Sequence, residues 1–154
     1  MFSCLIGQKI KTFFITSFFF FVPIFLSSNT IVFNKIEESS YNTEGLVHRI
    51  KASKKTINLE KLKHFSIFNQ KKTISEAIYY TNGTFYVKGI KIDFTTGYFY
   101  EGYFYMKGCF ARTKSTTIQA KSVIYKKKYI IFKNLILNKK NKIYHKFKYL
   151  VEIK

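Results

Sequence analysis

The residues able to do chemistry are few and scattered along the chain. The histidines His48, His64 and His145 lie far apart and have no partner ligands at metal-binding spacing. Beyond Glu101 the only acidic residue is Glu152, so general acid–base catalysis has few candidates there. The sequence contains no Gly-rich phosphate loop, no Gly-x-Ser-x-Gly motif and no paired carboxylates. We therefore expect a protein that is not an enzyme and that uses no metal and no cofactor.

An apolar segment near the start of the chain, 13–33, is the strongest single feature of the sequence. No charged residue lies inside it, and at ~1.5 Å per residue a helix of this length would span about 31 Å, close to the thickness of a bilayer core. Lys9 and Lys11 precede it, whereas Glu37 and Glu38 follow it. The positive-inside rule then places 1–12 in the cytosol and exports the rest of the chain.

Two interpretations of this segment remain open. It is either an uncleaved transmembrane anchor, which we favour, or a secretory signal whose apolar run ends at Leu26 and is cleaved after Ser28. Leu26 is a poor residue for the −3 position of a cleavage site. Cys4 and Cys109 lie on opposite sides of the segment, so we expect no disulfide between them. The predicted division is a tail at 1–12, an anchor at 13–33, a linker at 34–44 and an exported domain at 45–154.

The chain is strongly basic. It has 27 Lys and Arg residues against eight Asp and Glu residues, a formal net charge of +19. Such a surface attracts polyanions or anionic lipid head groups, although a solvated Lys-rich face is the simpler explanation. The abundance of Lys, Asn, Ile, Phe and Tyr is also typical of an AT-rich genome, which lowers the functional weight of the charge. A nucleic-acid-binding module remains an alternative, but export argues against it.

From Leu46 onward the pattern is that of β-strands. Thr, Ile, Val, Tyr and Phe dominate, with period-two alternation over stretches such as 116–125 and 143–153. Turn residues at 82–83, 95–97 and 138–141 predict hairpins, and the change of apolar phase at Gly89 predicts a β-bulge. We expect one continuous strand at 98–106. Ala-containing units recur at irregular spacing, which favours stacked hairpins over a strict solenoid. The predicted fold class is all-β.

The segment Tyr41–Ala52, with the sequence YNTEGLVHRIKA, resembles the LptC/LptA/OstA-like family of lipopolysaccharide-export proteins. The stretch 65–68 matches the position of the next strand of that family. Ile74–Phe94 is similar to its following Ala-containing hairpin, and Gly102–Tyr125 to its later Gly-rich strand pair. The similarity covers most of 41–137 and its motifs are loose.

This resemblance implies a β-jellyroll of curved antiparallel sheets in the periplasm, behind one N-terminal transmembrane helix in the inner membrane. The implied function is to receive lipopolysaccharide from an inner-membrane ABC transporter and to pass it to an LptA-like periplasmic protein by end-to-end strand pairing. If the signal were cleaved, the chain would instead be a soluble LptA-like carrier. The expected partners are thus lipopolysaccharide, the transporter complex, the bridge protein and the membrane, but not nucleic acid.

We expect the apolar faces of the central strands to enclose acyl chains. The predicted strand at 98–106 is aromatic on both faces, whereas a single core needs only one apolar face. Each buried methylene contributes about 0.8 kcal/mol, so a few chains would supply ample affinity. The alternative is that these side chains simply pack together. The predicted lipid-binding residues are Phe85, Val87, Ile90, Ile92, Phe94, Phe99, Tyr103, Tyr105, Ile118 and Ile124.

Overall fold

The computed structural model describes residues 16–17, 29–43, 45–65, 67–112 and 115–153. The predicted cytosolic tail lies outside these residues, and so does most of the predicted anchor. Within the part that is described, no helix is both long and apolar enough to cross a lipid bilayer.

The described residues form strands and short helical segments. These are β1 (Thr16–Ser17), β2 (Thr30–Asn42), β3 (Gly45–Asn58), α1 (Leu59–Lys63), the 3₁₀ turn η1 (Ile67–Asn69), α2 (Gln70–Ala77), β4 (Ile78–Val87), β5 (Ile90–Tyr100), β6 (Tyr103–Arg112), β7 (Thr116–Lys126), β8 (Tyr129–Lys139) and β9 (Lys142–Glu152).

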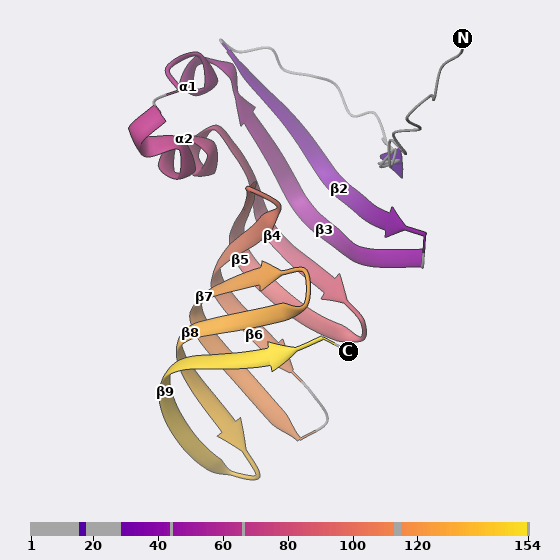
Figure 1. Cartoon of the computed structure of the whole chain (residues 1–154), viewed down its shortest axis with the longest axis vertical. Helices are drawn as coiled ribbons and strands as arrows, with labels where there is room; N and C mark the ends of the chain where they lie inside the picture. The colour runs from indigo at the N-terminus through magenta and orange to yellow at the C-terminus, as the bar shows by residue number, and fades with distance from the viewer. Residues whose placement is uncertain (1–15, 18–28, 44, 66, 113–114, 154) are drawn as a thin grey trace, which may run out of the picture.

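The strands follow one another in a single open antiparallel sheet. Each strand pairs with the next one in sequence, from β1 to β9 (Figure 1). Strand β1 contributes only two residues, at Thr16 and Ser17, so the sheet consists in practice of the eight long strands β2 to β9. Among the described residues β9 has β8 as its sole neighbour, so the sheet is not closed. The predicted antiparallel β architecture is confirmed, but as a single open sheet with short helical segments, so the fold is mostly β.

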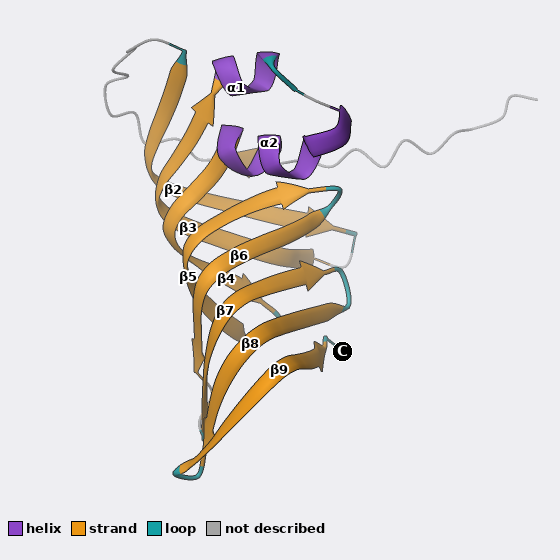
Figure 2. Ribbon diagram, turned by 90° about the vertical axis from the view of Figure 1, so that its left-hand side faces the viewer, coloured by secondary structure: helices purple, strands orange, loops and turns teal. Residues whose placement is uncertain are grey.

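The sheet curls so tightly that distant strands meet across its inner face. The ring of His48 in β3 lies 5.7 Å from the ring of Tyr125 in β7, centroid to centroid. These strands are four places apart in the sheet, a separation of about 19 Å if the sheet were flat. Figure 2 shows the long strands bending at one side of the sheet, with α1 and α2 at one end. The inner face is therefore folded onto itself.

The strands from β4 onward repeat every 26 residues, two strands at a time. Asn82, Gly108 and Asn134 occupy the same place in β4, β6 and β8, and all have positive φ angles, of 48°, 60° and 48°. At each of them the alternation changes phase. In β6, for example, Phe104 and Met106 are buried before Gly108, and the odd-numbered Cys109 and Ala111 are buried after it. The phase change keeps apolar side chains inside while the strand bends.

The hairpin turns repeat with the same period. Two-residue loops at 88–89, 101–102 and 140–141 have positive φ at both residues, from 40° to 78°. This is the type I′ geometry whose twist suits two-residue hairpins. The loop at 127–128 joins β7 to β8, lies 26 residues after the loop at 101–102 and is closed by the pairing of Lys126 with Tyr129. The sequence indicated units at irregular spacing. In the structure the strands and turns repeat every 26 residues, and the period becomes clear when hairpin turns are distinguished from bends within strands.

Several predicted turns were wrong, most of them for one shared reason. Asn82–Gly83 and 95–97 were predicted as turns, but they lie inside β4 and β5, where the strands bend. Gly89 was predicted as a bulge, but it forms a hairpin turn. The predicted strand 98–106 is two strands, because Glu101 and Gly102 make a turn in its middle. Asn82, Gly89 and Glu101 all have positive φ. Hairpin turns and strand bends both use residues that accept positive φ, so local sequence cannot separate them. Residues 95–97 have no positive φ and simply continue as strand.

The N-terminal half also differs from the prediction. The linker expected at 34–44 is strand up to Asn42, and β2 starts at Thr30, so the last residues of the predicted anchor belong to the sheet. The strand expected at 65–68 overlaps the 3₁₀ turn η1. The Ala-containing hairpin expected from Ile74 onward begins inside the helix α2, which gives way to β4 only at Ile78. These helices make the protein mostly β and not all-β.

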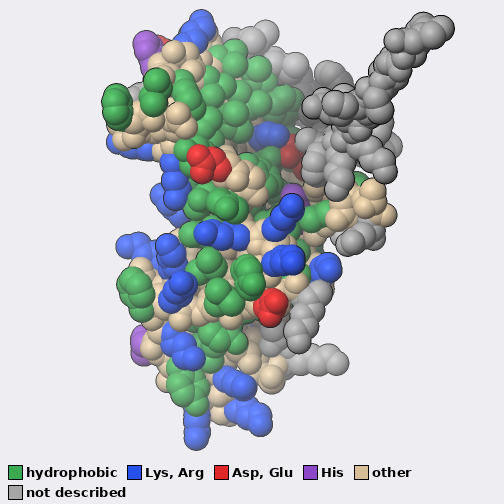
Figure 3. Space-filling view, viewed as in Figure 1, with side chains coloured by type: hydrophobic (Ala, Val, Ile, Leu, Met, Phe, Trp, Pro, Cys, Tyr) green, Lys and Arg blue, Asp and Glu red, His purple; other side chains and the backbone are tan. Residues whose placement is uncertain are grey.

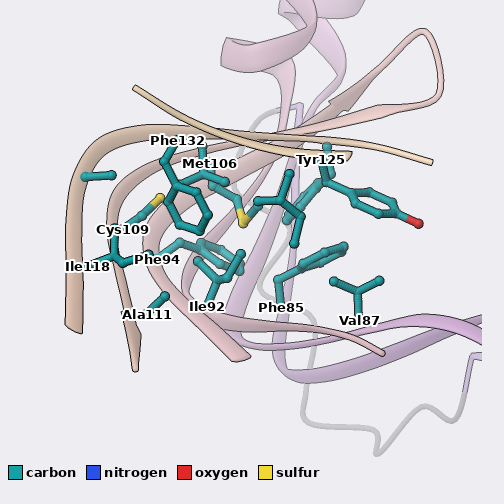
Figure 4. Close-up of a cluster of buried hydrophobic side chains, with 14 of the residues drawn as sticks. Phe85, Val87, Ile92, Phe94, Met106, Cys109, Ala111, Ile118, Tyr125 and Phe132 are labelled. Carbon is teal, nitrogen blue, oxygen red and sulfur yellow. The ribbon is translucent and has the colours of Figure 1, made fainter. Parts of the chain in front are cut away.

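A single hydrophobic core fills the inner face of the curled sheet. Its largest fully buried side chains are Phe85, Phe104, Phe132, Ile50, Ile92, Met106, Ile130 and Val123. Eight strands, β2 to β9, contribute to this core directly or through partly buried neighbours such as Ile36 and Val151. Figure 4 shows that its side chains converge from opposite halves of the bent strands.

Candidate lipid-binding and docking surfaces

The ten predicted lipid-binding residues divide between the two faces of the sheet. Seven lie on the inner face. Of these, five are buried and two, Ile90 and Phe99, are partly buried against them. Tyr103, Tyr105 and Ile124 lie on the outer face, because they alternate with the buried Phe104, Val123 and Tyr125. The structure thus brings together Phe85, Val87, Ile90, Ile92, Phe94, Phe99 and Ile118, and it separates Tyr103, Tyr105 and Ile124 from them.

The inner-face residues are already in contact with one another. Phe85 lies 5.1 Å from Phe104 and 4.9 Å from Tyr125, centroid to centroid. Phe99, which the sequence placed on the face opposite Phe104, pairs with it in register at 4.6 Å. Phe85 and Ile92 are 0 % exposed. In this conformation the inner face is therefore filled by the protein's own side chains.

Two open pockets lie elsewhere on the described surface. One, of about 400 Å³, is bounded by β2, β3 and the bend of β4 near Asn82. The other, of about 480 Å³, lies between α1 and α2 and is lined by polar and charged residues such as His64 and Glu76. None of the ten predicted residues lines either pocket.

The outer-face aromatics form a second, smaller cluster. Tyr98 stacks on Tyr105 with their ring centroids 5.2 Å apart. Lys71 of α2 places its ammonium group 3.9 Å from the Tyr105 ring centroid, and Lys126 lies 4.9 Å from that of Tyr103. Such cation–π contacts are worth about 0.5–1 kcal/mol at exposed sites. The aromatic surplus of 98–106 is therefore explained by contacts with α2 and with β7.

A polar cluster that the sequence did not predict lies beside the core. Glu38 of β2 accepts hydrogen bonds of 2.6 Å from Lys55 Nζ and from Tyr80 Oη. Burial raises the pKa of Tyr80 well above its ordinary value, and the neighbouring carboxylate raises it further. The pKa of His48 is lowered by burial, which outweighs the opposing effect of Glu38. No local motif marks this cluster, since its members come from three strands.

The last strand, β9, is the most exposed part of the sheet. Every residue from Lys142 to Leu150 is exposed, and Ile143 and Phe147 are 64 % and 79 % exposed. Its predicted clean alternation breaks, because Tyr149 pairs with the buried Phe132 while Lys146 pairs with the buried Leu135. Tyr149 and Lys146 therefore both lie on the inner face of the sheet. The result is an uncovered edge that mixes aromatic and aliphatic groups with lysines.

The opposite edge of the sheet carries carboxylates. Glu37 and Glu38 in β2 form ion pairs with Arg49, Lys51 and Lys55 of β3, at 2.6 to 3.5 Å. Two-residue β1 is the only described segment beyond β2. The two ends of the sheet therefore differ in charge, with paired acids at one edge and unneutralised lysines concentrated at the other.

The described residues offer little other chemistry. They contain no group of three or more His, Cys, Asp or Glu side chains able to hold a metal ion. Burial raises the pKa of the Cys109 thiol to about 12, so this cysteine is protonated and unreactive at neutral pH.

Comparison with known proteins gives no further guide to this site. No protein-family model and no curated protein matches the chain.

Proposed function

We propose that this chain is a membrane-anchored, non-catalytic component of lipopolysaccharide export. It would receive lipopolysaccharide from an inner-membrane ABC transporter and pass it to an LptA-like periplasmic protein. The observation that carries the proposal is the uncovered last strand, β9, of a curled antiparallel sheet. Its surface combines apolar groups with lysines, as binding a phosphorylated lipid requires.

Acyl chains would meet the protein first at the β9 end of the inner face. Tyr144 and Tyr149 are at inner-face positions there, because they pair with Leu137 and Phe132, yet they are 43 % and 36 % exposed. Deeper positions such as Phe85 and Ile92 would be reached only if the curled sheet loosens. The acyl path therefore begins at β9 and runs towards the predicted inner-face residues, while Tyr103, Tyr105 and Ile124 lie outside it.

Phosphate groups of the lipid would bind the lysines around β9. Lys142, Lys146 and Lys148 are exposed on this strand, and Lys133, Lys139 and Lys140 flank it on β8 and its turn. Charge-assisted hydrogen bonds from ammonium groups to phosphate are short and strong. With Glu152 the only acid in β9, the edge carries a net positive charge opposite an anionic head group.

The same edge would serve for transfer to the next protein. An unpaired edge strand presents backbone groups that a partner strand can bind by β-augmentation. A partner strand added to β9 would lengthen the curled sheet towards the longer jellyroll of the LptC/LptA family that the sequence resembles. Lipid lying along the inner face would then continue onto the partner without leaving an apolar surface.

Photo-crosslinking tests this path, and the two-face arrangement supplies its control. A benzoylphenylalanine at Tyr149 or Phe99 should capture lipopolysaccharide in cells whose transporter is active, with the stronger adduct at Tyr149. The same probe at Tyr103, a tyrosine of the outer face, should capture none. Adducts at Tyr103 but not at Tyr149 or Phe99 would contradict lipid transfer along the inner face.

A soluble carrier made by signal cleavage is a second candidate. Because β2 begins at Thr30, only the run 13–26 remains as a continuous apolar segment ahead of the sheet. Its 14 residues match the length of a signal-peptide core and fall short of the roughly 17 that a spanning helix needs. Intact-mass measurement decides between the two, since a mature N-terminus at Asn29 would replace the anchored form with the soluble one.

A further inference from the structure

The connection between α1 and α2 exposes apolar side chains that the sheet does not use. Ile67 is 79 % exposed and Phe68 is 96 % exposed, and Phe65 beside them is 45 % exposed. We call these three residues the apex. Single exposed hydrophobic residues are ordinary on a protein surface. Three of them at the tip of one helical hairpin form a patch, which is typical of a binding surface.

The helical hairpin has little hydrophobic burial of its own. Within the described residues of α1, η1 and α2, only Ala77 is buried. The hairpin is held to the sheet by polar contacts, including Lys71 on the Tyr105 ring and a 3.3 Å hydrogen bond from Tyr100 Oη to Gln70 Oε1. These contacts are made by Gln70 and Lys71, the first two residues of α2. The three apex residues are not among the side chains that form the described core or the partly buried ones packed against it. The apex side chains can therefore enter another medium without disturbing the core.

The charge around the apex favours an anionic partner. Lys61, Lys63, Lys71 and Lys72 flank it, against the acids Glu60 and Glu76. Glu76 pairs with Lys61 at 3.3 Å, while Lys63 and Lys72 are exposed. Figure 3 shows hydrophobic side chains over the two helices with Lys or Arg side chains beside them. An apolar tip bordered by lysines matches the interface of an anionic bilayer, where acyl chains lie beneath phosphates.

We propose that the apex inserts into the surface of an anionic lipid bilayer, with Phe68 and Ile67 among the acyl chains and Lys63 and Lys72 on the head-group phosphates. This goes beyond lipid transport and does not depend on it, because the apex is distinct from β9 and from the inner face. Burying one side chain of this size corresponds to a gain on the order of tenfold in membrane affinity. One lysine near an anionic surface corresponds to about fivefold.

The absence of tryptophan from the sequence allows a direct test. The full chain carrying Phe68→Trp is incorporated into nanodiscs of phosphatidylcholine, with or without phosphatidylglycerol. In the anionic discs its emission should shift to shorter wavelength, and lipids with brominated acyl chains should quench it. The shift should be smaller in the zwitterionic discs and should decrease as salt is added. Insertion at the apex requires quenching by lipid, whether or not the N-terminal segment is also embedded.

A matched control is provided by the outer face of β6. Phe110, 41 % exposed and with Arg112 Cζ 6.0 Å from its ring centroid, is also an exposed phenylalanine beside a basic side chain, and it lies away from both β9 and the inner face. Phe110→Trp should stay solvent-exposed and unquenched. Adding Lys63→Gln and Lys72→Gln to Phe68→Trp should weaken insertion of the apex about tenfold, seen as a smaller blue shift and less quenching. Equal quenching at both positions would overturn the proposal. So would a blue-shifted Phe68→Trp that brominated lipid does not quench, since a protein would then cover the apex.

Discussion

Strands β4 to β8 and the last strand, β9, share one spacing but differ in burial. Ile92 and Ile118 lie 26 residues apart at equivalent inner-face places and are 0 % and 7 % exposed, whereas the next equivalent, Tyr144, is 43 % exposed. Tyr144 is more exposed because β9 has a described partner strand on one side only, whereas the strands of Ile92 and Ile118 are paired on both sides. An aromatic or aliphatic residue at an inner-face position is thus buried only when strands flank it on both sides, which makes β9 the available surface.

Truncating one phenylalanine in each region should give the largest contrast. Phe104→Ala removes a 0 % exposed ring that contacts Phe85, Phe94 and Phe99, and it should lower the free energy of unfolding by about 3–5 kcal/mol. Phe147→Ala should change it by less than about 0.5 kcal/mol. Urea denaturation followed by circular dichroism measures both. Similar losses for the two variants would mean that β9 is covered in solution.

Two ion pairs, a partly buried one at the β2 edge of the sheet and an exposed one between α1 and α2, sharpen the comparison. Glu38→Gln leaves the Lys55 ammonium, whose side chain is only 20 % exposed, without its carboxylate partner and should cost about 2 kcal/mol of unfolding free energy. Glu76→Gln breaks a pair whose side chains are nearly half exposed and should cost less than about 1 kcal/mol. The same denaturation experiment applies, and equal costs would contradict the structural role given to Glu38.

The bend in the strands should be sensitive to a single methyl group. A Cβ at Gly83 would lie 2.7 Å from the backbone oxygen of Lys51 and 2.5 Å from Phe94 Cζ, so Gly83→Ala should lower the unfolding free energy by about 1–2 kcal/mol. The hairpin residue Gly102, with φ of +75° and open space around it, should accept asparagine with little loss. Thermal unfolding of Gly83→Ala and Gly102→Asn tests this. If Gly83→Ala left the melting temperature unchanged, the close packing of Gly83 against Lys51 and Phe94 would be contradicted.

The smallest expected effect is a loss of stability at acid pH through His48. Its pKa is lowered in the folded state by burial, so the unfolded chain binds a proton more readily. Above the ordinary histidine pKa of 6.5 His48 is neutral in both states and costs no unfolding free energy. As the pH drops below that value, the unfolded chain gains a proton first and the free energy of unfolding should fall. His48→Gln should remove this part of the pH dependence, as melting temperatures across the range will report. If His48→Gln left the pH dependence of the melting temperature unchanged, groups other than His48 would be responsible for the loss of stability at acid pH.

The candidate site could be predicted in part from local pattern. Residues such as Phe85, Val87, Ile92, Phe94 and Ile118 alternate within short strands, and all five are on the inner face. Tyr103 and Tyr105 were grouped with Phe99 because one strand was assumed from 98 to 106. The turn at Glu101–Gly102 reverses the chain and pairs Phe99 with Phe104 instead. A single missed turn therefore moved three aromatic residues relative to one another.

The sequence by itself determined that antiparallel β-hairpins dominate the fold and that its C-terminal strand is rich in lysine, but it did not reveal the helices α1 and α2. These properties follow from residue type and period-two alternation, which act over a few residues. Only the tertiary structure decided which Asn and Gly residues are turns and which are bends. It also decided that the inner face is filled, and that Glu38, Lys55 and Tyr80 meet. The physical reason is that positive φ serves both turns and bends, and that burial depends on neighbouring strands distant in sequence.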